Sequence, residues 1–146
     1  KKKKYSISPL RIFRSSKHGF GILAEKNLRK LTIINEYKGH YLDQNIENPT
    51  ELCYKLTGID LFLFRLNSRS ILDATIKGNY CRLINHSCKP NCFTRIIFHG
   101  QKNHILLITR QKIFSNEELS YNYCIDSEIL ELNPTHCFCG ELPCKG

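Results

Sequence analysis

Three cysteines stand within the last ten residues of the chain, and they restrict the fold of this segment more than any other sequence feature does. In the pattern CFCGELPC, Cys137 and Cys139 are two residues apart and Cys144 follows five residues later. Thiolates this close together can bind one metal ion, and structural zinc takes four ligands in a tetrahedron. The cluster therefore predicts a zinc site whose fourth ligand is His136 or a residue from elsewhere in the chain.

The spacing alone leaves the fourth ligand open. The chain has eight cysteines in 146 residues. The cysteines outside the cluster that could provide the fourth ligand are Cys81, Cys88 and Cys92. An even cysteine count also suits disulfides, but clustered cysteines behind an N-terminus without a secretory apolar stretch favour metal binding. The alternative to a metal site is three free cysteines on a frayed tail.

The composition is that of one globular domain, with 41% hydrophobic and 24% charged residues. No apolar run is long enough to cross a membrane. Lysine plus arginine exceed aspartate plus glutamate by 22 − 13 = +9, which favours proximity to nucleic acid through phosphate attraction. The sequence has no helix-turn-helix pattern, no zinc finger with paired histidines and no RNA-binding aromatic motif. A chain that opens on four lysines without a methionine is expected to be a domain excised from a longer protein.

Short apolar runs rich in β-branched and aromatic residues dominate the chain, and polar turns bound them. The predicted strands cover 61–66, 70–74, 93–98, 104–110 and 118–125, with a hairpin loop at 99–103. One helix is predicted at 48–57, with Asn48 as its cap, Pro49 at its first position and Gly58 after its end. The sequence therefore predicts a mostly β fold with few short helices.

Three further motifs carry groups that suit chemistry. The Gly-X-Gly turn in HGFGIL, at 18–23, lets a ligand approach the backbone closely. The bend INHSCKPNC, at 84–92, holds asparagine, histidine and two cysteines. In NEELSYNYC, at 116–124, strand alternation places Tyr121 and Tyr123 on one face. Taken singly, each motif also has an ordinary interpretation as a turn, a bend or an aromatic core.

Together these segments resemble a SET-domain lysine methyltransferase with a post-SET zinc tail. The resemblance rests on HGFGILAEKNL, EYKGHYL, ILDATIKGNYCRLINHSCKPNC, NEELSYNY and CFCGELPC, which occur in the family's order with compatible spacing. Within the family, the chain is most similar to the trithorax/COMPASS-type enzymes, which methylate lysine 4 of histone H3. The YNYCID segment resembles instead the nucleosomal lysine-36 type, so this target remains an alternative.

The resemblance implies a SET-domain fold of short curved sheets, in which the Asn-His-Ser-Cys segment forms a pseudoknot through a loop beside the last strand. It divides the chain into a basic N-terminal flank at 1–13, the SET domain at 14–126 and a zinc-binding post-SET segment at 127–146. The zinc ligands that it implies are Cys88, Cys137, Cys139 and Cys144.

The resemblance also implies sites for S-adenosylmethionine and for the substrate lysine. The cofactor-binding residues that it implies are Lys17, His18, Gly19, Phe20, Gly21, Tyr37, Asn85, His86 and Phe138. Tyr123 resembles the catalytic tyrosine, and Tyr121 resembles the residue that limits how many methyl groups are added. Phe62 stands in the substrate channel where related enzymes often have a tyrosine.

The implied reaction is an in-line methyl transfer to a neutral lysine amine, and it depends largely on positioning. The solution pKa of lysine is near 10.4, so a desolvating tyrosine-lined channel and a nearby sulfonium must disfavour the ammonium form. The implied setting is nuclear, with the histone H3 tail as partner and no membrane. Nucleosomal DNA and accessory subunits with WD-repeat and SPRY domains are candidate partners. Two alternatives are a catalytically silent SET-like chromatin-binding module and a zinc-stapled basic module that binds nucleic acid.

Overall fold

The structure is a computed structural model that describes residues 9–43, 52–54, 56–67, 69–123, 137–142 and 144. It divides into two compact units, each built from separated parts of the chain. The first unit combines Lys1–Asn35, Leu83–Thr94 and Leu107–Gly146. The second unit combines Glu36–Arg82 and Arg95–Leu106.

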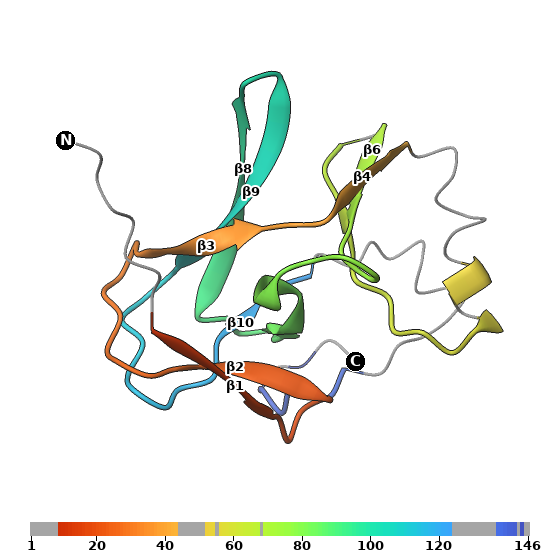
Figure 1. The fold of residues 1–146 in the computed structure, drawn as a ribbon. Helices are drawn as coiled ribbons and strands as arrows, with labels where there is room; N and C mark the ends of the chain where they lie inside the picture. The colour runs from red at the N-terminus through yellow and green to blue at the C-terminus, as the bar shows by residue number, and fades with distance from the viewer. Residues whose placement is uncertain are drawn as a thin grey trace. The chain divides into compact units, whose positions relative to one another are not determined.

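Strands make up most of the regular structure in the described residues (Figure 1). Their bounds are β1 Leu10–Arg14, β2 Phe20–Ala24, β3 Ile33–Tyr37, β4 His40–Asp43, β5 Leu63–Arg65, β6 Ser70–Asp73, β7 Asn85–His86, β8 Cys92–His99, β9 Lys102–Thr109 and β10 Ser120–Tyr121. The sheets have the orders β1-β2, β10-β7, β3-β9-β8 and β4-β6-β5.

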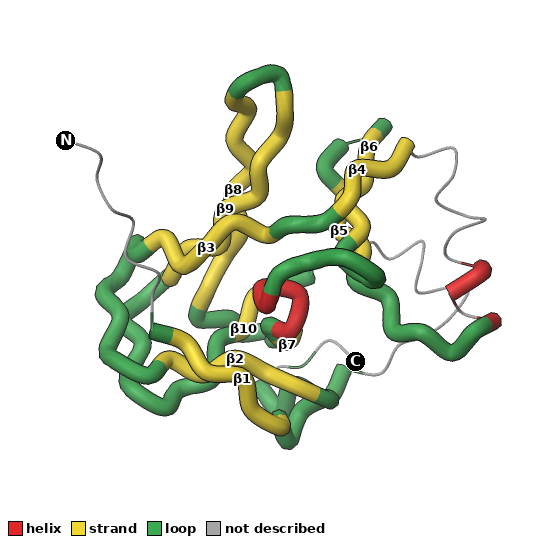
Figure 2. Tube along the Cα trace, viewed as in Figure 1, coloured by secondary structure: helices red, strands yellow, loops and turns green. Residues whose placement is uncertain are grey.

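Helix is limited, within the described part of the chain, to the 3₁₀-helix η2 (Tyr80–Leu83) and a short segment that includes Leu52–Tyr54 and Leu56 (Figure 2). The mostly β fold with few short helices is therefore confirmed. No helix among these residues is long and apolar enough to span a membrane.

In the first unit, β2 has backbone partners on both edges. Strand β1 pairs antiparallel with it and lies beside it in Figure 1. On the other edge, the Leu119 N–H donates to the Ile22 carbonyl at 2.8 Å, and the Ala24 N–H donates to the Glu117 carbonyl at 3.0 Å. The segment that leads into β10 is thereby held against β2. The largest fully buried apolar side chains of this unit are Ile22, Ile84, Leu107, Ile113 and Leu119.

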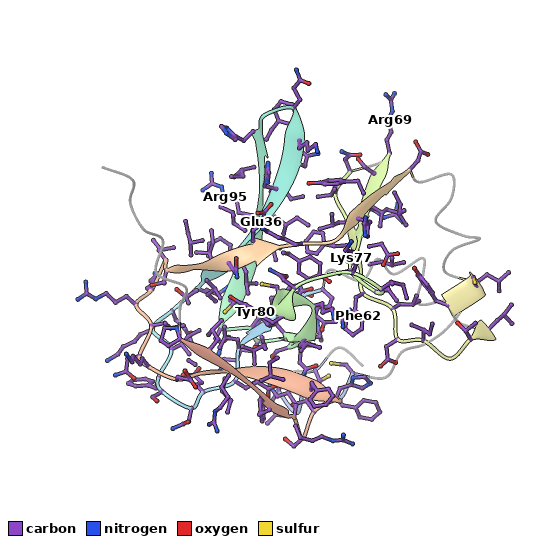
Figure 3. The ribbon with its side chains drawn as sticks, in the orientation of Figure 1. Glu36, Phe62, Arg69, Lys77, Tyr80 and Arg95 are labelled. Carbon is purple, nitrogen blue, oxygen red and sulfur yellow. The ribbon has the colours of Figure 1, made fainter. Side chains whose placement is uncertain are left out.

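The second unit contains the sheet β4-β6-β5 and an apolar core beside it. The core residues are Tyr37, Leu66, Leu72, Ala74, Cys81 and Ile105. The partly buried Phe62, Phe64 and Tyr80 pack against them, and Figure 3 labels Phe62 and Tyr80. The Tyr37 and Phe64 rings have centroids 5.7 Å apart, so aromatic contacts join this core to β5.

The hairpin predicted at 99–103 is confirmed as the tight turn between β8 and β9, which run side by side in Figure 1. Its two central residues, Gly100 and Gln101, have φ values of 56° and 64°. Positive φ at both positions is the type I′ geometry, whose twist matches that of the flanking strands. Strand β8 ends one residue later than predicted and β9 begins two residues earlier, because a two-residue turn leaves more residues to pair.

The helix predicted at 48–57 is confirmed at its C-terminal end, while the residues proposed to cap and begin it lie outside the described residues. Gly58 ends it with a φ of 68°. The Ile59 N–H then donates to the Tyr54 carbonyl at 3.0 Å, which is the long hydrogen bond of a Schellman motif. Glycine is needed at this position because it adopts positive φ without strain.

Gly39 lies where β4 meets β6 and leaves no room for a side chain. A Cβ atom there would lie 2.4 Å from the carbonyl oxygen of Asp73 and 2.7 Å from its carbonyl carbon. We expect Gly39→Ala to lower the free energy of unfolding by about 1–3 kcal/mol, because backbone atoms must shift. Urea denaturation measures this change. His40→Ala, at the exposed neighbouring position, is expected to stay within about 0.5 kcal/mol of the parent, and equal losses for both variants would contradict the steric explanation.

Candidate active site and metal centre

Two segments of the first unit that are distant in sequence meet as a parallel strand pair. In this pair Asn85 lies opposite Ser120, and His86 lies opposite Tyr121. The Ser87 N–H continues the contact by donating to the Tyr121 carbonyl at 3.2 Å. The Asn-His-Ser-Cys segment therefore lies beside the last described strand, while its threading through a loop stays a prediction.

The side chain of Asn85 connects this strand pair to the turn before β2. Its Nδ2 donates to the carbonyls of His18, at 3.3 Å, and Phe20, at 3.2 Å. The same nitrogen donates to Glu118 Oε1 at 2.9 Å, and that oxygen also accepts the Ser15 hydroxyl at 2.9 Å. Asn85 is only 8% exposed, so these contacts fix the backbone of the turn from the protein side.

The two glycines of this turn are needed for different reasons. Gly19 has a φ of 45° and open space where a Cβ atom would point. Gly21 has no such space, because a Cβ atom would lie 2.6 Å from Glu118 Oε1 and 2.7 Å from Phe13 Cε1. The Lys17 N–H donates to Ser15 Oγ at 3.1 Å. The turn therefore has an open backbone at Gly19 and a tightly packed one at Gly21.

Tyr123 is held by the segment that contains Ile84 and His86. Its hydroxyl donates to the Ile84 carbonyl at 2.8 Å, and its backbone N–H donates to His86 Nδ1 at 3.2 Å. Its ring lies edge-on to the His86 ring at 5.3 Å between centroids and 4.7 Å from the Tyr121 ring. Tyr123 keeps 40% of its surface exposed, yet burial around the phenol, followed by the Glu118 charge, raises its pKa to about 12. The hydroxyl is therefore protonated at neutral pH.

The strand predicted at 118–125 is wrong in its extent, because β10 ends at Tyr121. The reason is that the Tyr123 N–H donates to the His86 side chain and is therefore not used in a strand ladder. The two tyrosine rings nevertheless lie in contact, as their centroid distance of 4.7 Å requires. The predicted strand residues after Tyr123 lie outside the described residues.

The His86 ring has a partner at each nitrogen. Because Nδ1 accepts the Tyr123 N–H, the proton of the neutral ring sits on Nε2, which lies 3.5 Å from Cys88 Sγ. Burial, together with the nearby Lys17 ammonium, lowers the pKa of His86 below its ordinary value of 6.5. The ring is therefore neutral at physiological pH, and its tautomer is set by its neighbours.

The four predicted metal ligands lie together. The Sγ atoms of Cys88, Cys137, Cys139 and Cys144 all lie within 4.8 Å of one another. Cys88 Sγ is 3.9 Å from the sulfurs of Cys137 and of Cys144, and the Cys139–Cys144 separation is 3.6 Å. A tetrahedral zinc with bonds of about 2.3 Å places sulfurs about 3.8 Å apart, whereas a disulfide needs about 2.05 Å. The donor set therefore fits zinc.

The protonation of two cluster thiols follows from their surroundings. Backbone N–H groups of Cys88 and Glu141 lower the pKa of Cys139 to about 6. Desolvation raises the pKa of Cys137 to about 12. Cys139 therefore provides a thiolate at neutral pH, and a metal ion must displace the proton from Cys137 when it binds.

The other cysteines considered as a fourth ligand are core residues. Cys81 and Cys92 are fully buried, and burial raises the pKa of each to about 12. Cys92 Sγ donates to Asn91 Oδ1 at 3.5 Å, and Cys81 belongs to the core of the second unit. Neutral buried thiols behave as small apolar side chains. The remaining candidate, His136, lies outside the described residues.

Sequence reasoning missed two residues that hold the site together, Asn91 and Glu118. The Asn91 Nδ2 donates to Glu117 Oε1 at 3.0 Å and to the Glu118 carbonyl at 2.8 Å, while its Oδ1 accepts the Ser120 N–H at 2.9 Å. An asparagine after a proline in a bend is a signal for such backbone bonding. The role of Glu118 had no comparable local signal, because its partners Asn85 and Ser15 are 33 and 103 residues away in the sequence.

Several predicted site residues belong to the second unit or have exposed side chains. Tyr37 and Phe62 belong to the second unit. There Tyr37 is buried in the core, and the Phe62 ring lies 5.3 Å from Cζ of Arg82. Phe138, between two ligand cysteines, is 71% exposed. Phe20 is also exposed, so the rings of Phe20 and Phe138 are both accessible to a ligand.

Comparison with known proteins identifies the family. A SET domain profile matches residues 19–124. The chain belongs to the SET domain family. This SET domain is 38% identical over 139 residues to the "Histone-lysine N-methyltransferase, H3 lysine-4 specific" of Neurospora crassa. The aligned region covers 94% of this chain and 11% of that relative. It is 34% identical over 143 residues to "Histone-lysine N-methyltransferase 2B" of Homo sapiens, covering 98% of this chain and 5% of the relative.

A third relative is "Histone-lysine N-methyltransferase 2D" of Homo sapiens, which is 34% identical over 132 residues, or 90% of this chain and 2% of the relative. The SET domain thus spans a small fraction of the length of the curated relatives that it matches. The resemblance to the family expected from the five sequence motifs is confirmed.

The cysteine geometry predicts one bound zinc ion per chain. We expect Cys139→Ser to lose most of this zinc during gel filtration, because a hydroxyl is a poor replacement for a thiolate ligand. Elemental analysis of the purified protein measures the zinc content. Cys53→Ser is the matched control, since Cys53 is an exposed cysteine outside the cluster. Zinc retained at the parent level in Cys139→Ser would contradict the assignment.

The environment of Tyr123 predicts a late phenol titration. We expect the absorbance difference between the parent and Tyr123→Phe to show a phenolate appearing at a pKa of about 12 rather than 10. The unfolded chain releases this proton near 10, so between the two values rising pH lowers the stability that the buried phenol contributes. A difference step at or below pH 10 would contradict the buried hydroxyl.

Proposed function

We propose that this SET domain is the catalytic domain of an S-adenosylmethionine-dependent histone-lysine N-methyltransferase, with lysine 4 of histone H3 as its target. The observation that carries the proposal is the arrangement of Tyr123, whose neutral hydroxyl donates to the Ile84 carbonyl beside Asn85 and His86. The names of the relatives from Neurospora crassa and Homo sapiens support the reaction, and the former name supports lysine 4.

The turn before β2 and its neighbours fit the proposed cofactor. The open backbone at Gly19 leaves space for close approach, and the Lys17 ammonium offers a positive charge for a carboxylate. The exposed ring of Phe138 suits stacking on a purine. Asn85 acts in this proposal by fixing the carbonyls of His18 and Phe20. When bound, S-adenosylmethionine supplies a methyl group on a positively charged sulfur.

The proposed role of Tyr123 is to orient rather than to transfer a proton. A phenol whose pKa is about 12 stays neutral and would orient the substrate lysine without exchanging a proton with it. The lysine would reach this position as a neutral amine, its proton already lost to solvent, and would accept the methyl group that the bound cofactor would supply. The hydroxyl and the Ile84 carbonyl accepting from it present a polar edge beside the Tyr121 ring. Holding the reacting atoms in line provides most of the rate enhancement.

Tyr121 and Phe62 are the proposed channel residues that limit the number of methyl groups. Tyr121 is buried beside Tyr123 in the first unit. In the second unit, the Phe62 backbone is fixed by its N–H to Thr75 Oγ1 at 3.0 Å and by its carbonyl to the Ala74 N–H at 2.9 Å. A phenylalanine lacks the hydroxyl that orders water around a product amine, so Phe62 sets a product state different from that of a tyrosine.

The proposed partner is the histone H3 tail within the nucleosome, and the proposed location is therefore the nucleus. Nucleosomal DNA is a second partner, because the chain carries a net charge of +9. The second unit exposes Arg69, Lys77 and Arg95, which Figure 3 labels. Accessory subunits with WD-repeat and SPRY domains remain part of the proposal as partners that stabilise the active arrangement.

The test is a methyl-transfer assay on the zinc-loaded protein. It is incubated with S-adenosylmethionine and histone H3 peptides that present lysine 4 or lysine 36, and mass spectrometry reads the product. We expect methylation of lysine 4, reduced about a hundredfold in Tyr123→Phe, because loss of the hydroxyl misplaces the reacting groups. Tyr41→Phe removes a phenol hydroxyl that donates to the Asn103 carbonyl within the second unit, so it is the matched control for losing a hydrogen-bonded hydroxyl and is expected to keep the parent rate.

Each remaining outcome has a definite meaning. Methylation at lysine 36 alone would replace the proposed target with the alternative one. Cofactor binding without transfer to any H3 peptide or nucleosome, with or without accessory subunits, would contradict histone H3 as the substrate. Failure to bind S-adenosylmethionine in calorimetry would contradict the enzyme and leave two alternatives, the silent chromatin-binding module and the zinc-stapled module that binds nucleic acid.

A further inference from the structure

The His86 side chain contacts both the metal centre and the segment that carries Tyr123. Its Nδ1 accepts the backbone N–H of Tyr123 at 3.2 Å. Its Nε2 lies 3.5 Å from the sulfur of Cys88. Because a neutral imidazole carries one proton, acceptance at Nδ1 leaves Nε2 as the donor toward that sulfur. The ring therefore spans the two sites with an ordered donor and acceptor.

The sulfur that receives this hydrogen bond belongs to the metal-binding set. Cys88 Sγ lies 3.9 Å from the sulfurs of Cys137 and Cys144, which suits four thiolates around one zinc ion. A zinc-bound thiolate is a stronger acceptor than a thiol, because it carries negative charge. Occupation of the site by zinc therefore strengthens the Nε2–H contact and fixes the orientation of the ring.

On its other side, His86 contributes two of the contacts that place Tyr123. The Nδ1 bond holds the Tyr123 backbone where β10 has already ended, and the edge-on ring contact at 5.3 Å holds the side chain. The hydroxyl bond to the Ile84 carbonyl comes from the residue two positions earlier in the same segment. A rotation of the His86 ring therefore changes the backbone position of Tyr123.

We propose that His86 is a positioning residue through which zinc binding at Cys88 sets the location of Tyr123. Its importance for catalysis rests on the function proposed above, but the coupling between metal and tyrosine does not. Because both ring nitrogens have protein partners, neither of them is assigned to a cofactor hydrogen bond. The zinc centre is thus connected to the reaction site by one imidazole.

Two substitutions test separately the two hydrogen bonds of the His86 ring, at Nδ1 to the Tyr123 N–H and at Nε2 to Cys88 Sγ. His86→Asn keeps a carbonyl near the Nδ1 position for the Tyr123 N–H but has no donor that reaches Cys88. His86→Gln extends an amide donor to the Nε2 position toward Cys88. We expect His86→Asn to weaken zinc binding by about 10–100-fold, measured by competition with a chelator, and His86→Gln to retain most of the affinity. His40→Asn, an exposed histidine in β4, is the control for an unrelated loss of imidazole.

The parent protein provides a measurement that needs no substitution. In protein loaded with ¹¹³Cd, we expect NMR to detect coupling between the metal and the Nε2 proton of His86, since a hydrogen bond to a ligand sulfur transmits it. We also expect the amide resonance of Tyr123 to shift between the metal-free and metal-loaded forms. Neither readout requires S-adenosylmethionine or histone, so failure of methyl transfer leaves this test intact.

Three results would each contradict the proposed role of His86. A proton on Nδ1 of His86 in the loaded protein would exclude the donor to Cys88. Equal zinc affinity in His86→Asn, His86→Gln and the parent would remove the connection to the metal. A Tyr123 amide resonance that is unchanged by metal binding would remove the connection to the tyrosine.

Discussion

Asn85 and His86 pair in parallel with Ser120 and Tyr121, and this short ladder determines where the functional groups of the first unit lie. It aligns two segments more than thirty residues apart, so that consecutive side chains of one segment face different parts of the site. The Asn85 side chain faces the glycine turn, while that of His86 faces Tyr123 and Cys88. A ladder of only two residue pairs is weak by itself, and it persists because surrounding side chains complete its hydrogen bonds.

Those surrounding groups form a largely part-buried polar network rather than an apolar core. Asn91 satisfies backbone groups of the segment that enters β10, and Glu118 accepts from both Asn85 and Ser15. Among the described residues, no buried side-chain nitrogen or oxygen lacks a hydrogen-bond partner. Such a network is costly to interrupt, because a buried group left unpaired costs about 1–3 kcal/mol. It therefore specifies one arrangement of the site where apolar packing would allow several.

The structural features best predicted from the sequence are those that depend on residues close together in the chain. Strand content, the hairpin at Gly100 and the helix end at Gly58 follow from local patterns, and the structure confirms them. Spacing identified three metal ligands, but only the resemblance selected Cys88, because the fourth sulfur is brought in by tertiary structure. The end of β10 and the partners of Glu118 could not be read from local pattern. They depend on side chains from distant segments that replace the expected backbone pairing.

The four sulfur ligands also impose an order on the maturation of the chain. Cys88 and Cys137 are 49 residues apart, and closing a loop of this length costs about 3 kcal/mol of chain entropy. Structural zinc in small metal-binding peptides contributes about 10–16 kcal/mol, so the metal readily offsets this cost once all ligands are present. During synthesis, however, Cys144 leaves the ribosome long after the bend that contains Cys88. Until Cys144 emerges, the complete zinc site cannot contribute, and any folded Asn-His-Ser-Cys segment depends on its hydrogen bonds and on the packing of Ile84.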